Sequence, residues 1–591
     1  KVGQNFTSWI EIEDGQSITD VKLQSLYRSI DVEYQITNGV WEYDSVSKNT
    51  YNTRVVITIP ANTPEDKYDL IITTNTGDLI SKRAVKVLKE YKDSYYLVHF
   101  SDPHSKGAKT GTDAEVNRGM GLIRASAVID IANIIGAEVA IITGDNVQYS
   151  STDFLQWVTE YYEGHHGKGI NGILDFNGVG LVAQGDHDYS GTKTELMNNK
   201  VDFSNFANTH HGLKEYHITY GNNHRYIISE DASGRTPASI VNEHVNWINS
   251  VGQGNFRVVA AHKRDEMRDL VNGVNASLVL AGHNHYVSVD NPQLREGMPQ
   301  IVYTADSLRD GFKFNIFKVN ADGSYEANGD CRSHTASGKL NTGSYDVLAV
   351  DNDTANIDNW DLNLSLNYEY ENDGTKSTNK ATIINKYNQN FSTGKVRFVL
   401  KRGGIYTVSN GTITQEFDGE YNLNPVHVVD VQVMINKEST TVVEITNNSN
   451  EIENTNNEVL PMDTVLVRPS SDGLPIGPIV AYNMKDKYKW QGDLTLEEYE
   501  ARYHMPIYKT FNRDTPEYWD NVVDEMLMAR LHVSFLHARG CASDNPETCD
   551  GSCRPTGDMC PGNLNLFVEA VTRAEAEDVI RVGMWDDTGM Y

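Results

Sequence analysis

Five short segments of this 591-residue chain each end an apolar run on aspartate or histidine. They are "YYLVHFSDPH", "VAIITGDN", "GLVAQGDHD", "RVVAAH" and "LVLAGHNH". Each apolar run has the length of a buried strand, and the ligand sites of open α/β sheets lie beyond the carboxyl ends of the strands. We therefore expect the polar groups to gather at one edge of a sheet. Taken singly, each motif is more typical of a solvated turn or a helix cap.

The gathered side chains would suit a pair of divalent metal ions. Mixed carboxylate and imidazole ligands are typical of manganese, iron or zinc, whereas calcium prefers oxygen ligands alone. One tetrahedral ion cannot accept seven ligands, but two ions that share a bridging carboxylate can use them all. The seven candidates are Asp102, His104, Asp145, Asp186, His262, His283 and His285.

As an ordered set, the motifs "DPH", "GDN", "GDHD", "VAAH" and "GHNH" resemble the calcineurin-like metallophosphoesterase superfamily. The resemblance covers about residues 95–320. It implies a central α/β double-sheet sandwich and a dinuclear metal centre that hydrolyses a phosphate mono- or diester. By position it implies a first ion on Asp102, His104 and His285, a bridging Asp145, and a second ion on Asp186, His262 and His283.

The resemblance also implies a catalytic role for His187, beside the substrate phosphate, as a general acid or as a transition-state stabiliser. In such a centre two ions neutralise phosphate oxygens and activate a water for attack. Asp188 could orient His187 and keep its ring protonated. It could equally be a turn or helix cap, and the sequence leaves both alternatives open.

Two positions depart from the family pattern. The family usually has asparagine where this chain has Asp186, and the extra charge could raise metal affinity or weaken attraction for phosphate. The purple acid phosphatase branch has a tyrosine three positions after the bridging aspartate. Here that position is Gln148, and Tyr149 follows one residue later. The sequence therefore indicates a general metallophosphoesterase without the coloured ferric tyrosinate of the purple enzymes.

The elements that must position these groups alternate between strand and helix over residues 93–325. The apolar runs predict strands. Segment 112–136 predicts a helix, with Thr112 or Asp113 as its cap and Gly136 as its stop. Alternating strands and helices predict an α/β domain with a largely parallel sheet.

The rest of the sequence divides into flanking domains. Short alternating runs predict an Ig-like β-sandwich at 1–92 and a second β-rich domain at 335–446. The Asn-rich stretch at 447–460 predicts a linker. Residues 461–591 predict an α/β domain, either a small accessory domain or part of a barrel, since a complete (β/α) barrel needs about 250 residues.

The C-terminal segment also resembles, weakly, the start of a (β/α)-barrel glycoside hydrolase, with Asp586 and Asp587 at a predicted strand end. This leaves an alternative function. The protein would then process or bind glycans, and its phosphoesterase domain would be accessory or non-catalytic. Under the main hypothesis the substrate is a phosphorylated small molecule or a phosphorylated glycan.

Composition restricts the partners and the location. The formal net charge of −30 disfavours nucleic acid as a partner, and no apolar run is long enough to span a bilayer. The spacing of the clustered cysteines fits two disulfides better than a zinc site, which indicates an exported protein in the periplasm, on the cell surface or secreted. These cysteines are Cys541, Cys549, Cys553 and Cys560, and Cys331 is then predicted to be a free thiol.

Overall fold

The chain forms two compact units, Lys1–Glu451 and Ile452–Tyr591, and their boundary lies within the Asn-rich segment. The computed structural model describes residues 1–42, 50–105, 113–147, 161–164, 171–188, 215–221, 223–229, 245–263, 274–285, 287–290, 302–305, 308, 313–327, 333–334, 340–341, 345–346, 362–422, 424–448, 533–537, 569, 571–573 and 581–585.

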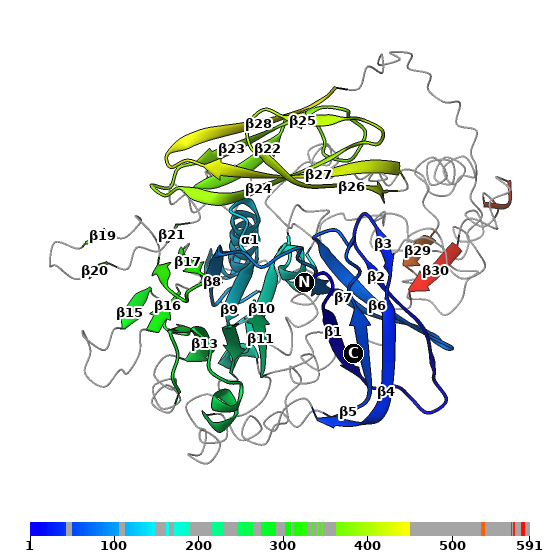
Figure 1. Cartoon of the computed structure of the whole chain (residues 1–591), viewed down its shortest axis with the longest axis horizontal. Coiled ribbons are helices and arrows are strands. Elements are labelled where there is room, and N and C mark those ends of the chain that lie inside the picture. Colours follow the sequence, from blue (N-terminus) through cyan, green and yellow to red (C-terminus); the bar gives the residue numbers. More distant parts are fainter. Residues whose placement is uncertain are drawn as a thin grey trace, which may run out of the picture. The chain divides into compact units, whose positions relative to one another are not determined.

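The chain begins with two antiparallel sheets that share one apolar core (Figure 1). One has the order β1-β5-β4 and consists of β1 (Asn5–Ile10), β4 (Glu33–Glu42) and β5 (Thr50–Thr58). The other has the order β3-β2-β6-β7 and consists of β2 (Ile18–Gln24), β3 (Ser29–Asp31), β6 (Lys67–Thr74) and β7 (Gly77–Lys86). Apolar residues at every second position, such as Val55 and Ile57, face this core because successive strand side chains point to opposite faces.

Two six-stranded sheets form the centre of the first unit. The first has the order β10-β9-β8-β17-β18, with β21 also paired to β17, and consists of β8 (Ser94–Phe100), β9 (Val139–Thr143), β10 (Val179–Ala183), β17 (Lys313–Asn320), β18 (Tyr325–Ala327) and β21 (Tyr345–Asp346). The second has the order β11-β12-β13-β14-β16-β15 and consists of β11 (Tyr216–Tyr220), β12 (His224–Ile228), β13 (Phe256–Lys263), β14 (Leu278–Gly282), β15 (Ser288–Asp290) and β16 (Val302–Thr304).

Strands β8, β9 and β10 run parallel, as do β12, β13, β14 and β16, so each set brings its carboxyl ends to one edge. Buried side chains from both sheets meet in a single apolar cluster, and they include Leu97, Ile141, Leu181, Tyr226, Val258 and Leu280. The sheets therefore pack face to face, which is the α/β double-sheet arrangement expected from the sequence resemblance. A short pair, β19 (Ser333–His334) and β20 (Leu340–Asn341), stands apart from them.

Helix α1 (Asp113–Ile134) covers the other face of the first sheet, where Val98 and Phe100 join its apolar cluster. The helix begins at one of the two predicted cap positions. It ends before Gly136, whose φ of 68° is the left-handed conformation that favours glycine at a helix C-terminus. The Thr393 hydroxyl donates to the Ile135 carbonyl at 2.9 Å, so the helix end is tied to a later part of the chain.

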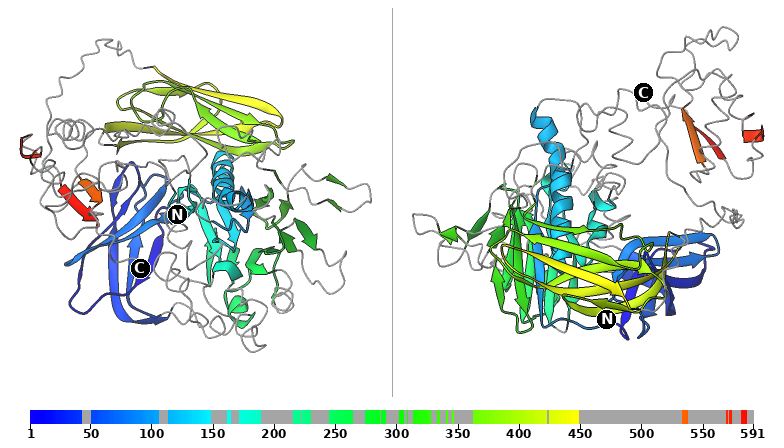
Figure 2. Two further views of the ribbon diagram at one scale, coloured as in Figure 1. Left: turned by 180° about the vertical axis from the view of Figure 1, so that it is seen from behind. Right: turned by 90° about the horizontal axis from the view of Figure 1, so that it is seen from above.

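That later part consists of two more antiparallel sheets (Figure 2). One has the order β22-β23-β28-β25 and consists of β22 (Leu364–Tyr368), β23 (Asn379–Asn385), β25 (Tyr406–Val408) and β28 (Ser439–Asn447). The other has the order β24-β27-β26 and consists of β24 (Phe391–Lys401), β26 (Thr412–Tyr421) and β27 (Asn424–Ile435). Their buried side chains, among them Phe391 and Val431, belong to the same apolar cluster as α1.

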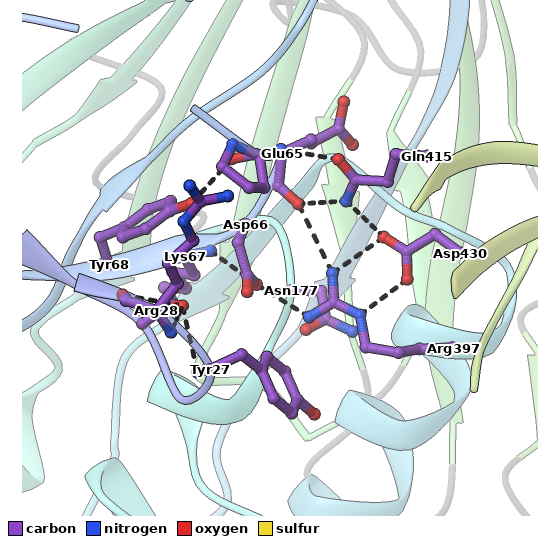
Figure 3. Close-up of polar contacts among 12 residues, drawn as sticks. Tyr27, Arg28, Glu65, Asp66, Lys67, Tyr68, Asn177, Arg397, Gln415 and Asp430 are labelled. Carbon is purple, nitrogen blue, oxygen red and sulfur yellow. Dashed lines mark hydrogen bonds and ion pairs between the residues drawn. The ribbon is translucent and has the colours of Figure 1, made fainter. Parts of the chain in front are cut away.

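A buried polar network ties these sheets to the N-terminal sheets (Figure 3). The Arg397 guanidinium binds both oxygens of Asp430 at 2.7 and 2.8 Å and donates to Asp66 at 3.0 Å. The Gln415 amide accepts from the Glu65 backbone N–H at 2.8 Å and donates to the Glu65 carbonyl at 2.7 Å. Because each charge has hydrogen-bonding partners of opposite charge, the network joins the two sandwiches without leaving a buried ion uncompensated.

Replacing Arg397 with alanine should lower the free energy of unfolding by about 3 kcal/mol, because it leaves the fully buried Asp430 carboxylate without its main partner. Arg402→Ala is the matched control. Its ion pair with Asp418 is about half exposed, so the expected loss is below about 1 kcal/mol. Urea unfolding of both variants measures the difference, and equal midpoints would contradict a structural role for the network.

The same network has a defined pH dependence. Burial acts to raise the pKa of Asp430, but Arg397 and Lys395 outweigh burial and hold it well below its usual range. The contribution of Asp430 to stability is therefore fully present above the unfolded pKa of about 3.9, and it is lost as the pH falls through the lower folded pKa.

In the second unit, β29 (Val533–His537) pairs in parallel with β30 (Arg581–Trp585). Both strands coincide with predicted strands. Asp586, Asp587 and all five cysteines lie outside the described residues. In the part of the chain that the structure describes, no helix combines the length and apolar character needed to cross a membrane.

Candidate metal centre

Most of the predicted ligands lie in loops that follow central strands of the two facing sheets. Asp102 and His104 follow β8, Asp145 follows β9, and His283 and His285 follow β14. His262 lies within β13, close to its end. Backbone hydrogen bonds join the first two loops, since Asp102 N donates to Gly144 O at 3.1 Å and His104 N donates to Asp145 O at 2.9 Å. The loops therefore hold one another at the sheet edge.

One group of potential ligands consists of Asp102, His104, Asp145 and His285, whose ligand atoms all lie within 4.8 Å of one another. The Nε2 atoms of His104 and His285 are 3.3 Å apart. His285 Nε2 also lies 3.3 Å from Asp102 Oδ1, and His104 Nε2 lies 3.5 Å from Asp145 Oδ2. Carboxylate oxygens and imidazole nitrogens that converge in this way form a donor set that suits a divalent transition-metal ion.

A second group consists of Asp145, His262 and His283, again within 4.8 Å. His262 Nε2 lies 3.2 Å from Asp145 Oδ2, and the ring centroids of His262 and His283 are 5.1 Å apart. Asp145 belongs to both groups. The arrangement is therefore compatible with two metal ions that share one bridging carboxylate.

The tautomer of His262 suits a metal ligand. Its Nδ1 lies 2.6 Å from the Thr143 carbonyl oxygen, which can only accept, so Nδ1 carries the proton. Nε2 then presents its lone pair toward Asp145. The Ser101 hydroxyl lies 3.0 Å from the same carbonyl oxygen and donates its hydrogen bond to the Asp102 carboxylate. Such second-layer hydrogen bonds orient metal ligands and increase their basicity.

Backbone strain is concentrated at the same place. Eight non-glycine residues of the described chain have positive φ, and five of them are candidate ligands: Asp102, His104, Asp145, His283 and His285. Each such conformation costs roughly 1–3 kcal/mol, and it persists where the surrounding structure enforces it, typically at functional sites. Both His283 and His285 depart from extended backbone, and these two histidines, only two residues apart, belong to different ligand groups.

Only glycine fits at position 282, because Ser101 and Asp102 lie against its backbone. A Cβ atom there would lie 1.9 Å from the Ser101 hydroxyl and 2.5 Å from an Asp102 carboxylate oxygen. Without a side chain at Gly282, the His283 backbone N–H can reach Asp102 Oδ2 at 3.0 Å. This hydrogen bond fixes one oxygen of Asp102, while the other faces His285.

The pKa shifts of the candidate ligands favour the protonation states that bind metal ions. Burial acts to raise the pKa of Asp102, but His262, His104 and His285 outweigh burial and hold it below its usual range. The pKa of Asp145 is lowered for the same reason, with His262 as the main opposing group. Burial lowers the pKa of His104. Ionised carboxylates and neutral imidazoles are the forms that bind metal, so the residues present fit the ions that the sequence predicts.

His187 lies next to the centre and belongs to neither ligand group. Its ring stands edge-on to that of His104, with centroids 4.7 Å apart, and its backbone N–H donates to Asp145 Oδ1 at 2.9 Å. The side chain is half-buried. The ring therefore lies beside the aspartate that both ligand groups share.

Asp188 is fully buried and accepts three hydrogen bonds from the loops around it. The donors are Asn146 Nδ2 at 2.8 Å, Val147 N at 3.0 Å and Gly185 N at 2.8 Å. Burial, together with Asp145, raises the pKa of Asp188 to about 7. These contacts correspond to the turn-cap alternative, in which Asp188 holds the loop after β10 against the loop that carries Asp145.

Several residues that the sequence did not indicate form hydrogen bonds next to the candidate ligands. His99 Nε2 lies 3.0 Å from the Thr143 hydroxyl, and its Nδ1 lies 3.2 Å from the Asn315 amide. Asn146 donates to the Ala183 carbonyl at 3.0 Å as well as to Asp188. Asn146 directly follows Asp145, so the sequence motif "GDN" could have indicated it. Asn315 has none, because it comes from distant β17.

Asp186 opens a short 3-10 helix, η4 (Asp186–Asp188), directly after β10. The next residue, His187, contacts Asp145 through its backbone, but the side chain of Asp186 lies outside the described part of the structure. Gln148 and Tyr149, on which the expected lack of colour depends, also lie outside the described residues.

Comparisons with known proteins give one family match and several structural likenesses. Residues 477–591 match a domain of unknown function, DUF5010. No curated protein sequence matches the chain.

Many solved structures are similar to this chain, and they include the following three. Purple acid phosphatase PPD1 from yellow lupin (Lupinus luteus) seeds is 11% identical over 58% of this chain and 72% of its own, with a TM-score of 0.34. PhoD is 11% identical over 50% and 78%, with a TM-score of 0.28. A dimetal phosphatase from Danio rerio is 9% identical over 39% and 98%, with a TM-score of 0.24.

Proposed function

We propose that the chain hydrolyses a phosphate ester, a mono- or diester, in a reaction that depends on two divalent metal ions. The observation that supports this most directly is the pair of ligand groups that share Asp145. Manganese, iron and zinc all suit the mixed oxygen and imidazole donors. The substrate is a phosphorylated small molecule or glycan, and the protein acts outside the cytoplasm.

In this reaction the chain's own residues would hold the ions, donate a proton and position the loops. Asp102, His104 and His285 would hold one ion, and His262, His283 and Asp186 the other, with Asp145 between them. When bound, the ions neutralise the phosphate oxygens and lower the pKa of a water molecule. His187 lies beside this position and would donate a proton to the leaving oxygen. Asp188 and Asn146 hold the loops of Asp145 and His187 in register.

A panel of aryl phosphate mono- and diesters, combined with elemental analysis, tests the proposal. We expect two ions per chain, hydrolysis of at least one ester class, loss of activity with a chelator, and recovery when manganese, iron or zinc is restored. A protein that carries both ions and hydrolyses none of the esters would instead favour the alternative, in which this domain is non-catalytic and the C-terminal segment acts on glycans. Hydrolysis of aryl glycosides in the same assay would support that alternative.

A further inference from the structure

A cationic cavity lies on the first unit at some distance from the metal centre. Its volume is about 200 Å³, and it lies where β7 of the N-terminal sheets meets the segment 173–180 of the central domain. Four of its lining residues are basic: Lys67, Lys82, Arg83 and Lys86. None of the described lining residues carries a carboxylate. In a chain with a net charge of −30, this concentration of positive charge is unusual.

Lys67 is the innermost of these cations and is only 5% exposed. Its Nζ donates to the backbone carbonyls of Leu174 at 3.2 Å and Phe176 at 3.0 Å. Arg83 Nε donates to the same Leu174 carbonyl at 3.3 Å. These partners are neutral dipoles in the segment 173–180, so they orient the two cations without cancelling their charge.

The carboxylates next to the lining residues have partners of their own. Asp69 accepts from the Arg83 backbone N–H at 2.7 Å, and Asp175 accepts from the Gly172 backbone N–H at 2.7 Å. Glu163 pairs with Lys82 at 2.8 Å on the surface. Glu65 lies 3.9 Å from Lys86 and 3.7 Å from Lys395, so it is shared between two cations. Burial, followed by Arg83 and Lys86, lowers the pKa of Lys67 well below its usual value, and it outweighs Asp175 and Asp69, which act to raise it. A bound anion would offset this repulsion.

We propose that this cavity binds a tetrahedral oxyanion, as free phosphate or sulfate or as such a group carried by a larger ligand. Its volume corresponds to about six or seven water molecules at about 30 Å³ each, which is enough for the anion and part of its hydration shell. Cations from β6 and β7 converge on it, as suits a group with several charged oxygens.

This site is separate from the metal centre. The cavity is lined by Val179 and Gly180 at the start of β10, whereas the predicted ligand loop follows Ala183 at the other end. A strand rises about 3.3 Å per residue, so the two sites are separated by roughly the length of β10, about 13 Å. An anion in the cavity therefore cannot touch the metal ligands, and its binding does not depend on the proposed hydrolysis.

Isothermal titration of the metal-loaded full chain tests the proposal, with inorganic sulfate, glucose 6-sulfate and acetate at constant ionic strength. The test variants are Lys82→Gln, whose side chain is exposed, and the double variant Lys82→Gln/Arg83→Gln. Lys89→Gln is the matched control, because it removes one positive charge from the same region outside the cavity. Circular dichroism verifies that each variant is folded. If the double variant does not fold, the result for Lys82→Gln alone tests the proposal.

We expect sulfate to saturate a site in the wild type and in Lys89→Gln. The Kd for sulfate should rise about tenfold or more in the double variant, because two charge-assisted hydrogen-bond donors to the anion are lost. Glucose 6-sulfate that binds more tightly than sulfate would identify a carried group, and weaker binding would identify the free anion. The proposal is wrong if sulfate does not bind, if acetate binds equally well, or if Lys89→Gln weakens binding as much as the test variants do.

Discussion

Asp145→Asn should reduce metal content from two ions per chain to fewer than one and lower turnover by about 10³-fold or more. Asp145 is the only residue that belongs to both described ligand groups, so neutralising it weakens both sites at once. Metal ions typically supply several kcal/mol of transition-state stabilisation, and each 1.36 kcal/mol corresponds to a factor of ten in rate. Elemental analysis and steady-state kinetics on the same preparation measure both effects.

Asp130→Asn is the matched control for this experiment. Asp130 is a half-buried aspartate of α1 whose carboxylate accepts from the Asn171 amide at 2.6 Å, and it belongs to neither ligand group. Burial raises its pKa to about 6, so a neutral side chain is well tolerated there. The variant should keep both ions and near-normal turnover. An Asp145→Asn protein that keeps two ions would show that the carboxylate does not bridge them.

His187→Ala should keep both ions and slow turnover by about 10²-fold, the usual contribution of a general acid. The ring lies against His104 but outside both ligand groups, so no ion depends on it. The decisive measurement is the dependence on the leaving group. If His187 donates the proton, the loss should be large for an alkyl phosphate and much smaller for a nitrophenyl phosphate, whose phenolate leaves without help.

Two other outcomes would assign His187 a different role. A loss of equal size for both leaving groups would indicate that His187 stabilises the phosphate charge and does not donate a proton. A loss of metal in His187→Ala would indicate that its backbone contact with Asp145 depends on the side chain, and the role as a general acid would then be wrong.

Local sequence patterns predicted the central strands, the end of α1 and the candidate ligands. Apolar runs followed by Asp or His indicated the central strands and their polar ends, because a strand's burial and its termination depend on adjacent residues. Gly136 indicated the end of α1 for the same reason, since the left-handed conformation there is a property of one position. The order of the motifs indicated a candidate ligand set before any geometry was known.

Only the tertiary structure decided how these groups meet. His104 and His285 are 181 residues apart in the chain, yet their Nε2 atoms lie 3.3 Å from each other. The tautomer of His262 depends on the carbonyl of Thr143, and Asp188 accepts hydrogen bonds from Asn146 and from Gly185, which lie in different loops. The cationic cavity likewise joins β7 to the segment 173–180. Such contacts depend on how sheets pack, and packing sums many weak interactions between residues that no local pattern relates.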